Sequence, residues 1–321
     1  MYKQAIISNF LGEIRNRFMV YQGPRDLDGK FESAKQIKGL SGLELAYPQD
    51  FADRAHLDAL LKKYGYEAAA LNFRCRRNDK WLRGSFTSSH SEDVDEVVQE
   101  MKTCIDCAHE MGVRYITTCP LNEGHDYLFE MDYSVAYDNI VRAFREIGDY
   151  AAERAPEIRI CIEYKYSEPR TAASSPGAGE ALALCQEVDR ENIGVNLDIG
   201  HALQAGERPA QSAAMLHKAG KLFYVHVNDN DRIGDWDMIP GSINFWDFVE
   251  FFYYLRRIGY SGWLTYDVYP KENPAPEVFN SSFQAVSKLI EIAGRIDSAK
   301  MDQLMYERNP VAVMNYLYTL L

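Results

Sequence analysis

The segment 224–241, YVHVNDNDRIGDWDMIPG, places a histidine and four aspartates directly after an apolar run. His226 lies at the end of that run, and Asp229, Asp231, Asp235 and Asp237 follow within eleven residues. Carboxylates this close repel one another unless a cation or hydrogen-bond donors compensate their charge. The two carboxylates of D-W-D can point the same way in a loop and bind one cation. A solvated acidic turn is the alternative.

Three further carboxylates stand at the ends of apolar runs elsewhere in the chain. They are Glu163, Asp198 and Asp267. If these runs are neighbouring strands of one barrel, their ends meet at one face, and the three carboxylates converge with His226. Unrelated polar residues are also common at strand ends, but this set in register favours a metal site. Oxygen ligands with one imidazole suit Mn²⁺, Mg²⁺ or Co²⁺, and we expect Mn²⁺.

Asp198 and His201 form a D-x-x-H pair at the end of one of these runs. Gly200 between them permits a sharp turn, so both side chains can face the same cavity. His201 could instead cap a helix.

The elements that would position these residues are predicted by alternating strand and helix patterns. Eight short apolar or β-branched runs predict strands at 5–10, 42–47, 68–73, 115–120, 159–165, 194–201, 223–229 and 262–268. Helical patterns lie around 54–64, 92–111, 134–154, 177–190, 210–219 and 244–257.

Strands that alternate with helices pair in parallel, and eight such units close an α/β fold, the (β/α)8 TIM barrel. A doubly wound sheet would need a glycine-rich turn after the first strand, and none is present. We expect the barrel to span residues 1–297. Residues 298–321 should form a helical extension that packs on the barrel or on a partner subunit.

Composition restricts the partners and the compartment. The chain has 321 residues, 46% of them apolar, and a net charge of −12, which argues against nucleic acid or a membrane surface as partner. No apolar stretch approaches the ~18 residues of a membrane span. The six cysteines are scattered, which predicts reduced thiols and a cytoplasmic protein. CIDC at 104–107 lies within a predicted helix, and core packing is favoured there over metal or redox chemistry.

The motifs CIEYK, NLDIGH, YVHVND…DWD and LTYDVYP resemble the xylose-isomerase-like barrel superfamily. That superfamily includes xylose isomerase, rhamnose isomerase and the ketose 3-epimerases. The resemblance covers roughly residues 155–270, and the first four strands match in architecture only.

Resemblance to the aldose–ketose isomerases implies two metal sites. The implied first-site ligands are Glu163, Asp198, His226 and Asp267, and the implied second-site ligands are Asp198, His201, Asp235 and Asp237. An E-x-K motif, Glu163 and Lys165, implies a lysine that polarises the substrate carbonyl oxygen. The histidine that assists ring opening in xylose isomerase has no counterpart, because the second strand ends in Tyr47 and Pro48.

Other branches of the superfamily imply different reactions. Ketose 3-epimerases use one metal and two glutamates as bases, and Asp267 stands where one of these glutamates is expected. They also use an arginine six residues after the seventh-strand histidine, where Arg232 lies. Metal-dependent C-glycoside deglycosidases have a similar length and a small second subunit. Both of these reactions abstract a proton beside a carbonyl, and His125, on the loop after the fourth strand, is a candidate base besides Glu163.

The resemblance therefore implies a divalent-metal-dependent isomerase that interconverts an aldose and a ketose. It acts on a small sugar or glycoside, as a homo-oligomer or with a small subunit. Epimerase and deglycosidase are the alternatives, and an inactive barrel used as a binding subunit is the non-enzymatic one. Aromatic residues stack on sugar rings, so Trp81, Tyr127 and Trp236 are candidate substrate contacts, although a structural role is favoured for each.

Overall fold

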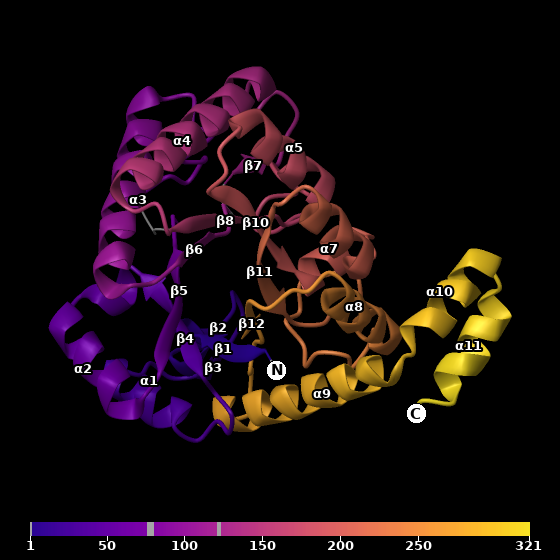
Figure 1. The fold of residues 1–321 in the computed structure, drawn as a ribbon. Helices are drawn as coiled ribbons and strands as arrows, with labels where there is room; N and C mark the ends of the chain where they lie inside the picture. Colours follow the sequence, from indigo (N-terminus) through magenta and orange to yellow (C-terminus); the bar gives the residue numbers. More distant parts are fainter. Residues whose placement is uncertain (1, 76–79, 121–122) are drawn as a thin grey trace.

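The structure, a computed structural model, describes residues 2–75, 80–120 and 123–321. Within this part of the chain, eight parallel strands close a barrel in the order β1-β12-β11-β10-β8-β6-β5-β4 (Figure 1). Their bounds are β1 (Lys3–Ile7), β4 (Gly42–Tyr47), β5 (Glu67–Phe73), β6 (Tyr115–Thr118), β8 (Arg159–Glu163), β10 (Ile193–Asp198), β11 (Leu222–Val227) and β12 (Trp263–Tyr266). The predicted (β/α)8 barrel is confirmed.

Helices surround the barrel and cover its strands (Figure 1). They are α1 (Leu27–Ala34), α2 (Arg54–Tyr64), α3 (Ser91–Met111), α4 (Tyr133–Arg154), α5 (Ala178–Val188), α6 (Ile199–Gln204), α7 (Pro209–Lys218), α8 (Phe245–Arg257) and α9 (Ala275–Arg295). The helix α1, which has few apolar residues, was not expected from the sequence.

The helix α3 illustrates how the sequence specifies these elements. Val94, Val98 and Met101 recur at helical spacing and are buried against the strands. Glu92 lies in the first turn, where the helix dipole favours a negative charge. Gly112 ends the helix in the left-handed conformation, with φ of 67°.

The CIDC motif lies on the same helix. Cys104 is fully buried in the core, and burial raises the pKa of its thiol well above the ordinary value. Cys107 is half-buried, and Arg54 donates to its sulfur at 3.2 Å. Among the described residues, neither belongs to a group of side chains close enough to hold a metal. Core packing therefore accounts for Cys104.

Two small antiparallel sheets lie among the loops. Strands β2 (Ile14–Arg15) and β3 (Val20–Gln22) form a hairpin after β1. Strands β7 (Gly124–His125) and β9 (Ala172–Ala173) join the loop after β6 to the loop after β8. The second sheet ties together two of the loops that follow barrel strands.

The C-terminal region forms two short helices, α10 (Ser298–Glu307) and α11 (Pro310–Tyr318), which project from one side of the barrel in Figure 1. Trp246 of α8 packs edge-on against Tyr318, with ring centroids 5.8 Å apart. The Tyr254 hydroxyl of α8 contacts the sulfur of Met305 at 3.8 Å. These helices thus pack on the outer helices of their own chain.

In the described residues, no helix is both long and apolar enough to span a membrane.

Candidate metal centre

Barrel register brings the four predicted first-site ligands together. In the parallel pairing, Asp198 lies beside His226, and Glu163 lies beside Asn196, two residues before Asp198. Because side chains alternate across a strand, residues two apart share a face. The four residues Glu163, Asp198, His226 and Asp267 each offer a ligand atom, and these atoms all lie within 4.8 Å of one another.

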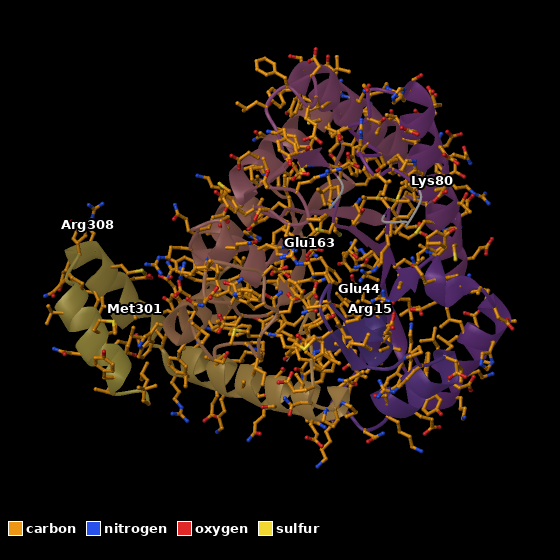
Figure 2. The ribbon with its side chains drawn as sticks, turned by 180° about the vertical axis from the view of Figure 1, so that it is seen from behind. Arg15, Glu44, Lys80, Glu163, Met301 and Arg308 are labelled. Carbon is orange, nitrogen blue, oxygen red and sulfur yellow. The ribbon has the colours of Figure 1, made fainter. Side chains whose placement is uncertain are left out.

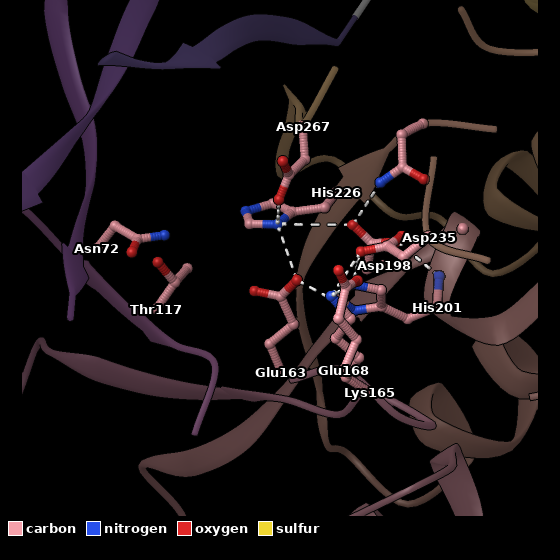
Figure 3. Close-up of polar contacts among 12 residues, drawn as sticks. Asn72, Thr117, Glu163, Lys165, Glu168, Asp198, His201, His226, Asp235 and Asp267 are labelled. Atoms are coloured by element: carbon pink, nitrogen blue, oxygen red, sulfur yellow. Dashed lines mark hydrogen bonds and ion pairs between the residues drawn. The ribbon is translucent and has the colours of Figure 1, made fainter. Parts of the chain in front are cut away.

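The imidazole of His226 lies at the centre of this group. Its Nδ1 atom is 3.4 Å from Glu163 Oε1, 3.8 Å from Asp198 Oδ2 and 3.5 Å from Asp267 Oδ2 (Figure 3). Nδ1 is buried and has no hydrogen-bond partner. A buried nitrogen without a partner, facing three carboxylates, fits a divalent cation at this position.

The other ring nitrogen of His226 is held by a residue that the sequence patterns did not single out. Glu44 on β4 is fully buried, and its Oε2 lies 3.0 Å from His226 Nε2. Its Oε1 accepts hydrogen bonds from Asn72 and Thr117, each at 2.6 Å. Glu44 therefore orients the ring, so that Nε2 carries the proton and Nδ1 faces the carboxylates. Figure 2 shows Glu44 and Glu163 together in the body of the barrel.

Burial and mutual interaction perturb the acids and bases of this group. Burial raises the pKa of Glu163, but the His226 and His201 imidazoles outweigh it and lower that pKa to about 2. Burial and the neighbouring Glu163 and Asp267 carboxylates raise the pKa of Asp198 to about 6. The nearby carboxylates raise the pKa of His226 well above its ordinary value, although burial opposes them. The group thus holds excess negative charge that a cation would neutralise.

The predicted second-site residues adjoin the first group. Asp198 caps α6 by accepting from the His201 backbone N–H at 2.8 Å. His201 Nε2 lies 3.2 Å from Asp235 Oδ2. Gly200 has no positive φ. A Cβ there would lie 1.7 Å from Asn228 Oδ1, so close approach, rather than the sharp turn we expected, requires glycine.

Asp235 and Asp237 lie on either side of an exposed tryptophan. Asp235 is almost fully buried, and its Oδ1 has no hydrogen-bond partner. The pKa of Asp237 is raised well above its ordinary value by burial and by the carboxylates of Asp235 and Asp267. Both aspartates therefore interact with the first-site and second-site residues. The Oδ1 atom of Asp235, which has no hydrogen-bond partner, could bind a second cation.

Lys165 reaches this group from the residues after β8. Its Nζ lies 2.7 Å from Asp235 Oδ2 and 3.1 Å from Glu168 Oε2 (Figure 3). Burial alone would lower the pKa of Lys165, but Asp235 and Glu168 raise it well above its ordinary value. The ammonium is therefore charged and fixed between Asp235 and Glu168. A pocket next to it is lined by Cys119, Glu163, Lys165 and Glu168, among others.

Arg232 takes part in a structural network at the start of α8. It has a positive φ of 68°, and its guanidinium lies 2.9 Å from Asp247 Oδ2. Its Nε donates to Asn244 Oδ1 at 3.0 Å. The spacing to His226 indicated a substrate contact, but these partners engage the guanidinium within the fold.

Asp229 and Asp231 serve the turn that follows β11. Asp229 is fully buried and accepts from the backbone N–H groups of Ile243 and Asn244, at 2.8 and 3.1 Å. Asp231 accepts from the Trp236 indole N–H at 2.8 Å. Hydrogen bonds therefore compensate the negative charge of two of the four aspartates that follow His226.

The remaining predicted residues occupy different environments. Trp81 is buried in the hydrophobic core, with the Lys80 ammonium 4.6 Å from its ring centroid. Tyr127 is exposed, and Trp236 is about half exposed. The His125 ring packs against Tyr133, with centroids 5.0 Å apart, and His125 pairs with β9 through its backbone. None of these four belongs to the two groups of potential metal ligands found among the described residues.

Comparison with known proteins places this geometry in a family. Residues 31–289 match the family described as xylose isomerase-like TIM barrel. A xylose isomerase from Streptomyces lividans is 30% identical over 210 residues, which is 64% of this chain and 49% of that protein. The chain thus spans about half the length of this curated relative.

Solved structures share the fold over nearly the whole chain. An L-ribulose 3-epimerase has a TM-score of 0.71 at 17% identity, covering 92% of this chain and 96% of that chain. A D-allulose 3-epimerase from Methylomonas sp., in complex with D-allulose, has a TM-score of 0.69 at 20% identity, covering 89% and 96%. At these identities the likeness shows the fold alone. The family match over residues 31–289 shows that this chain belongs to the xylose isomerase-like TIM barrel family.

Proposed function

We propose that the protein is a divalent-metal-dependent sugar isomerase that interconverts an aldose and a ketose. One observation carries the proposal: a charged lysine lines the same pocket as Glu163, which belongs to a group of three carboxylates and one imidazole. Lys165 Nζ lies 2.7 Å from Asp235, and Glu163, two residues before Lys165, belongs to the first metal group. A bound cation can polarise a sugar carbonyl, and a fixed hydrogen-bond donor stabilises the negative charge that develops on its oxygen.

Glu163, Asp198, His226 and Asp267 would hold the first cation, with His201, Asp235 and Asp237 as ligands of a second beside Asp198. Oxygen-rich ligation favours Mn²⁺, with Mg²⁺ or Co²⁺ as alternatives. When bound, the metal would act as a Lewis acid on the sugar oxygens and align the substrate.

The protein's own groups would divide the remaining work. Lys165 would donate a hydrogen bond to the carbonyl oxygen of the open-chain sugar, where negative charge develops. Asp235 and Glu168 hold its ammonium in place before substrate arrives. Glu44 keeps His226 in the tautomer that presents Nδ1.

Two features favour the isomerase over the 3-epimerase. Arg232, the residue that would support an epimerase, is engaged by Asp247 and Asn244. The eighth strand is followed by Asp267, whose side chain is shorter than that of a glutamate base. The 30% sequence identity to a xylose isomerase supports the same assignment, over an alignment that spans 49% of that protein.

The test is product analysis with metal-depleted protein and a panel of free sugars, in D₂O, with and without Mn²⁺. We expect a ketose from at least one aldose, only with Mn²⁺, and little deuterium in the product if hydride shifts between carbons. Conversion of a ketose to its C3 epimer, with deuterium at C3, would identify an epimerase. Failure to convert any sugar while binding Mn²⁺ would favour a binding subunit.

A variant pair makes the test specific to the lysine. Lys165→Met should slow conversion by orders of magnitude while metal binding remains, because Lys165 is not a ligand. Lys300→Met is the matched control, since Lys300 lies on α10, outside the barrel, above the ring of Tyr316.

A further inference from the structure

A second group of ligand atoms lies next to the first and includes a sulfur. Cys119, Glu163 and His201 each offer one ligand atom, and the three atoms lie within 4.8 Å of one another. Cys119 directly follows β6, Glu163 ends β8, and His201 lies on α6 after β10. Three successive barrel strands thus deliver a thiol, a carboxylate and an imidazole to one place.

The imidazole of His201 has a nitrogen that points into this group without a partner. His201 is 4% exposed, and its Nε2 is hydrogen-bonded to Asp235. Its Nδ1 is buried, has no hydrogen-bond partner and lies 3.3 Å from Glu163 Oε1. The arrangement parallels that of His226, in which a carboxylate holds Nε2 and Nδ1 faces Glu163. A carboxylate that fixes one nitrogen prepares the other as a metal ligand.

The surroundings give a cation access and balance its charge. Cys119 and Glu163 both line the pocket beside the metal group. Lys165 interacts electrostatically with Cys119, and cysteine binds metals as the thiolate. Asp235 and Glu168 pair with the Lys165 ammonium and reduce its repulsion of a cation.

We propose that Cys119 Sγ, His201 Nδ1 and the Glu163 carboxylate form a site for a thiophilic divalent cation, such as Zn²⁺ or Cd²⁺, that overlaps the proposed catalytic site. Thiolate with imidazole selects these metals over Mn²⁺ and Mg²⁺, which prefer oxygen. A cation there takes Glu163 and His201 away from the proposed catalytic site and inhibits it. That inhibition rests on the proposed function, whereas the binding itself does not.

The test uses Co²⁺, because a cobalt–thiolate bond gives an intense charge-transfer band in the near ultraviolet that oxygen and nitrogen ligands do not give. Metal-depleted full-length protein is titrated with Co²⁺ under reducing conditions. We expect this band to appear and to be removed by Zn²⁺. Cys119→Ser and Cys119→Ala should both lose the band and still bind Mn²⁺, which shows that they are folded.

Two further variants separate this site from its surroundings. Cys107→Ser should keep the band, because Cys107 is the other half-buried cysteine and lies on the outer helix α3. Asp267→Asn should also keep it while Mn²⁺ binding weakens, because Asp267 belongs only to the first group. Absence of the band in the unmodified protein, or its survival in both Cys119 variants, would overturn the proposal. Neither result would bear on the Mn²⁺-dependent isomerase.

Discussion

Replacing Glu44 with glutamine tests whether the residue behind the metal group controls metal binding. The contact between Glu44 Oε2 and His226 Nε2 is 3.0 Å long and fully buried at both ends. Glutamine keeps the shape but removes the charge, and its amide cannot accept from His226, Asn72 and Thr117 together. The imidazole then loses part of its orientation and basicity.

The size of the effect follows from this geometry. Loss of a residue that orients a metal ligand lowers metal affinity by roughly 10- to 100-fold, or about 1.4–2.8 kcal/mol. Glu44→Ala would be less informative. It leaves three buried groups short of an acceptor, at about 1–3 kcal/mol each, and would threaten folding itself.

The assay is isothermal titration of metal-depleted protein with Mn²⁺, together with thermal unfolding without metal. Glu67→Gln is the matched control. Glu67 is the first residue of β5, at the end of the barrel away from the metal group, and it is exposed and paired with Lys3 at 2.7 Å. We expect Glu44→Gln to weaken Mn²⁺ binding and Glu67→Gln to leave it unchanged. Equal affinities in the two variants would refute the role of Glu44.

Four further outcomes are expected. Asp198→Asn should abolish activity and weaken Mn²⁺ binding measured by titration, because Asp198 belongs to both proposed sites; retained activity would remove the basis of the site. Lys165→Met should lower kcat by about 10²- to 10⁴-fold in a steady-state assay, the range for loss of a general acid, with unchanged Mn²⁺ affinity. Arg232→Met should lower the unfolding free energy by roughly 1–2 kcal/mol in urea denaturation, through loss of Asp247 and Asn244 as partners, without raising KM. Metal binding should strengthen as pH rises. Burial lowers the pKa of His201, but the Asp198 and Asp235 carboxylates outweigh it and raise that pKa to about 10, so a metal that binds His201 must displace a proton. Titration calorimetry in buffers of different ionisation enthalpy measures this proton release.

The sequence was sufficient to predict the first metal group because barrel topology converts strand ends into neighbours. Glu163, Asp198, His226 and Asp267 are far apart along the chain, but each closes an apolar run. Once the runs are assigned to parallel strands, their ends must meet at one face. Assignment of the strands therefore placed the four side chains.

Glu44 could not be predicted in the same way. It stands within the run GLELAY, and its partner His226 is 182 residues away. A glutamate in an otherwise apolar strand was the only available signal. Such a residue must find buried donors in the fold, and those donors, Asn72 and Thr117, come from two other strands.

Arg232 and Trp81 show the opposite limit. Their spacing and type were compatible with substrate binding, but tertiary partners decide what a side chain contacts. Asp247 and Asn244 hold the arginine, and the hydrophobic core holds the tryptophan. Neither partnership leaves a pattern in the local sequence.

The central claim is that Glu163, Asp198, His226 and Asp267 bind a divalent cation. Anomalous diffraction at the manganese edge, from crystals of the protein grown with Mn²⁺, tests it most directly. The account predicts an anomalous peak among the three carboxylates, bonded to Nδ1 of His226, and no such peak in crystals of Asp198→Asn. A structure with Mn²⁺ bound elsewhere, and His226 Nδ1 without a metal, would contradict it.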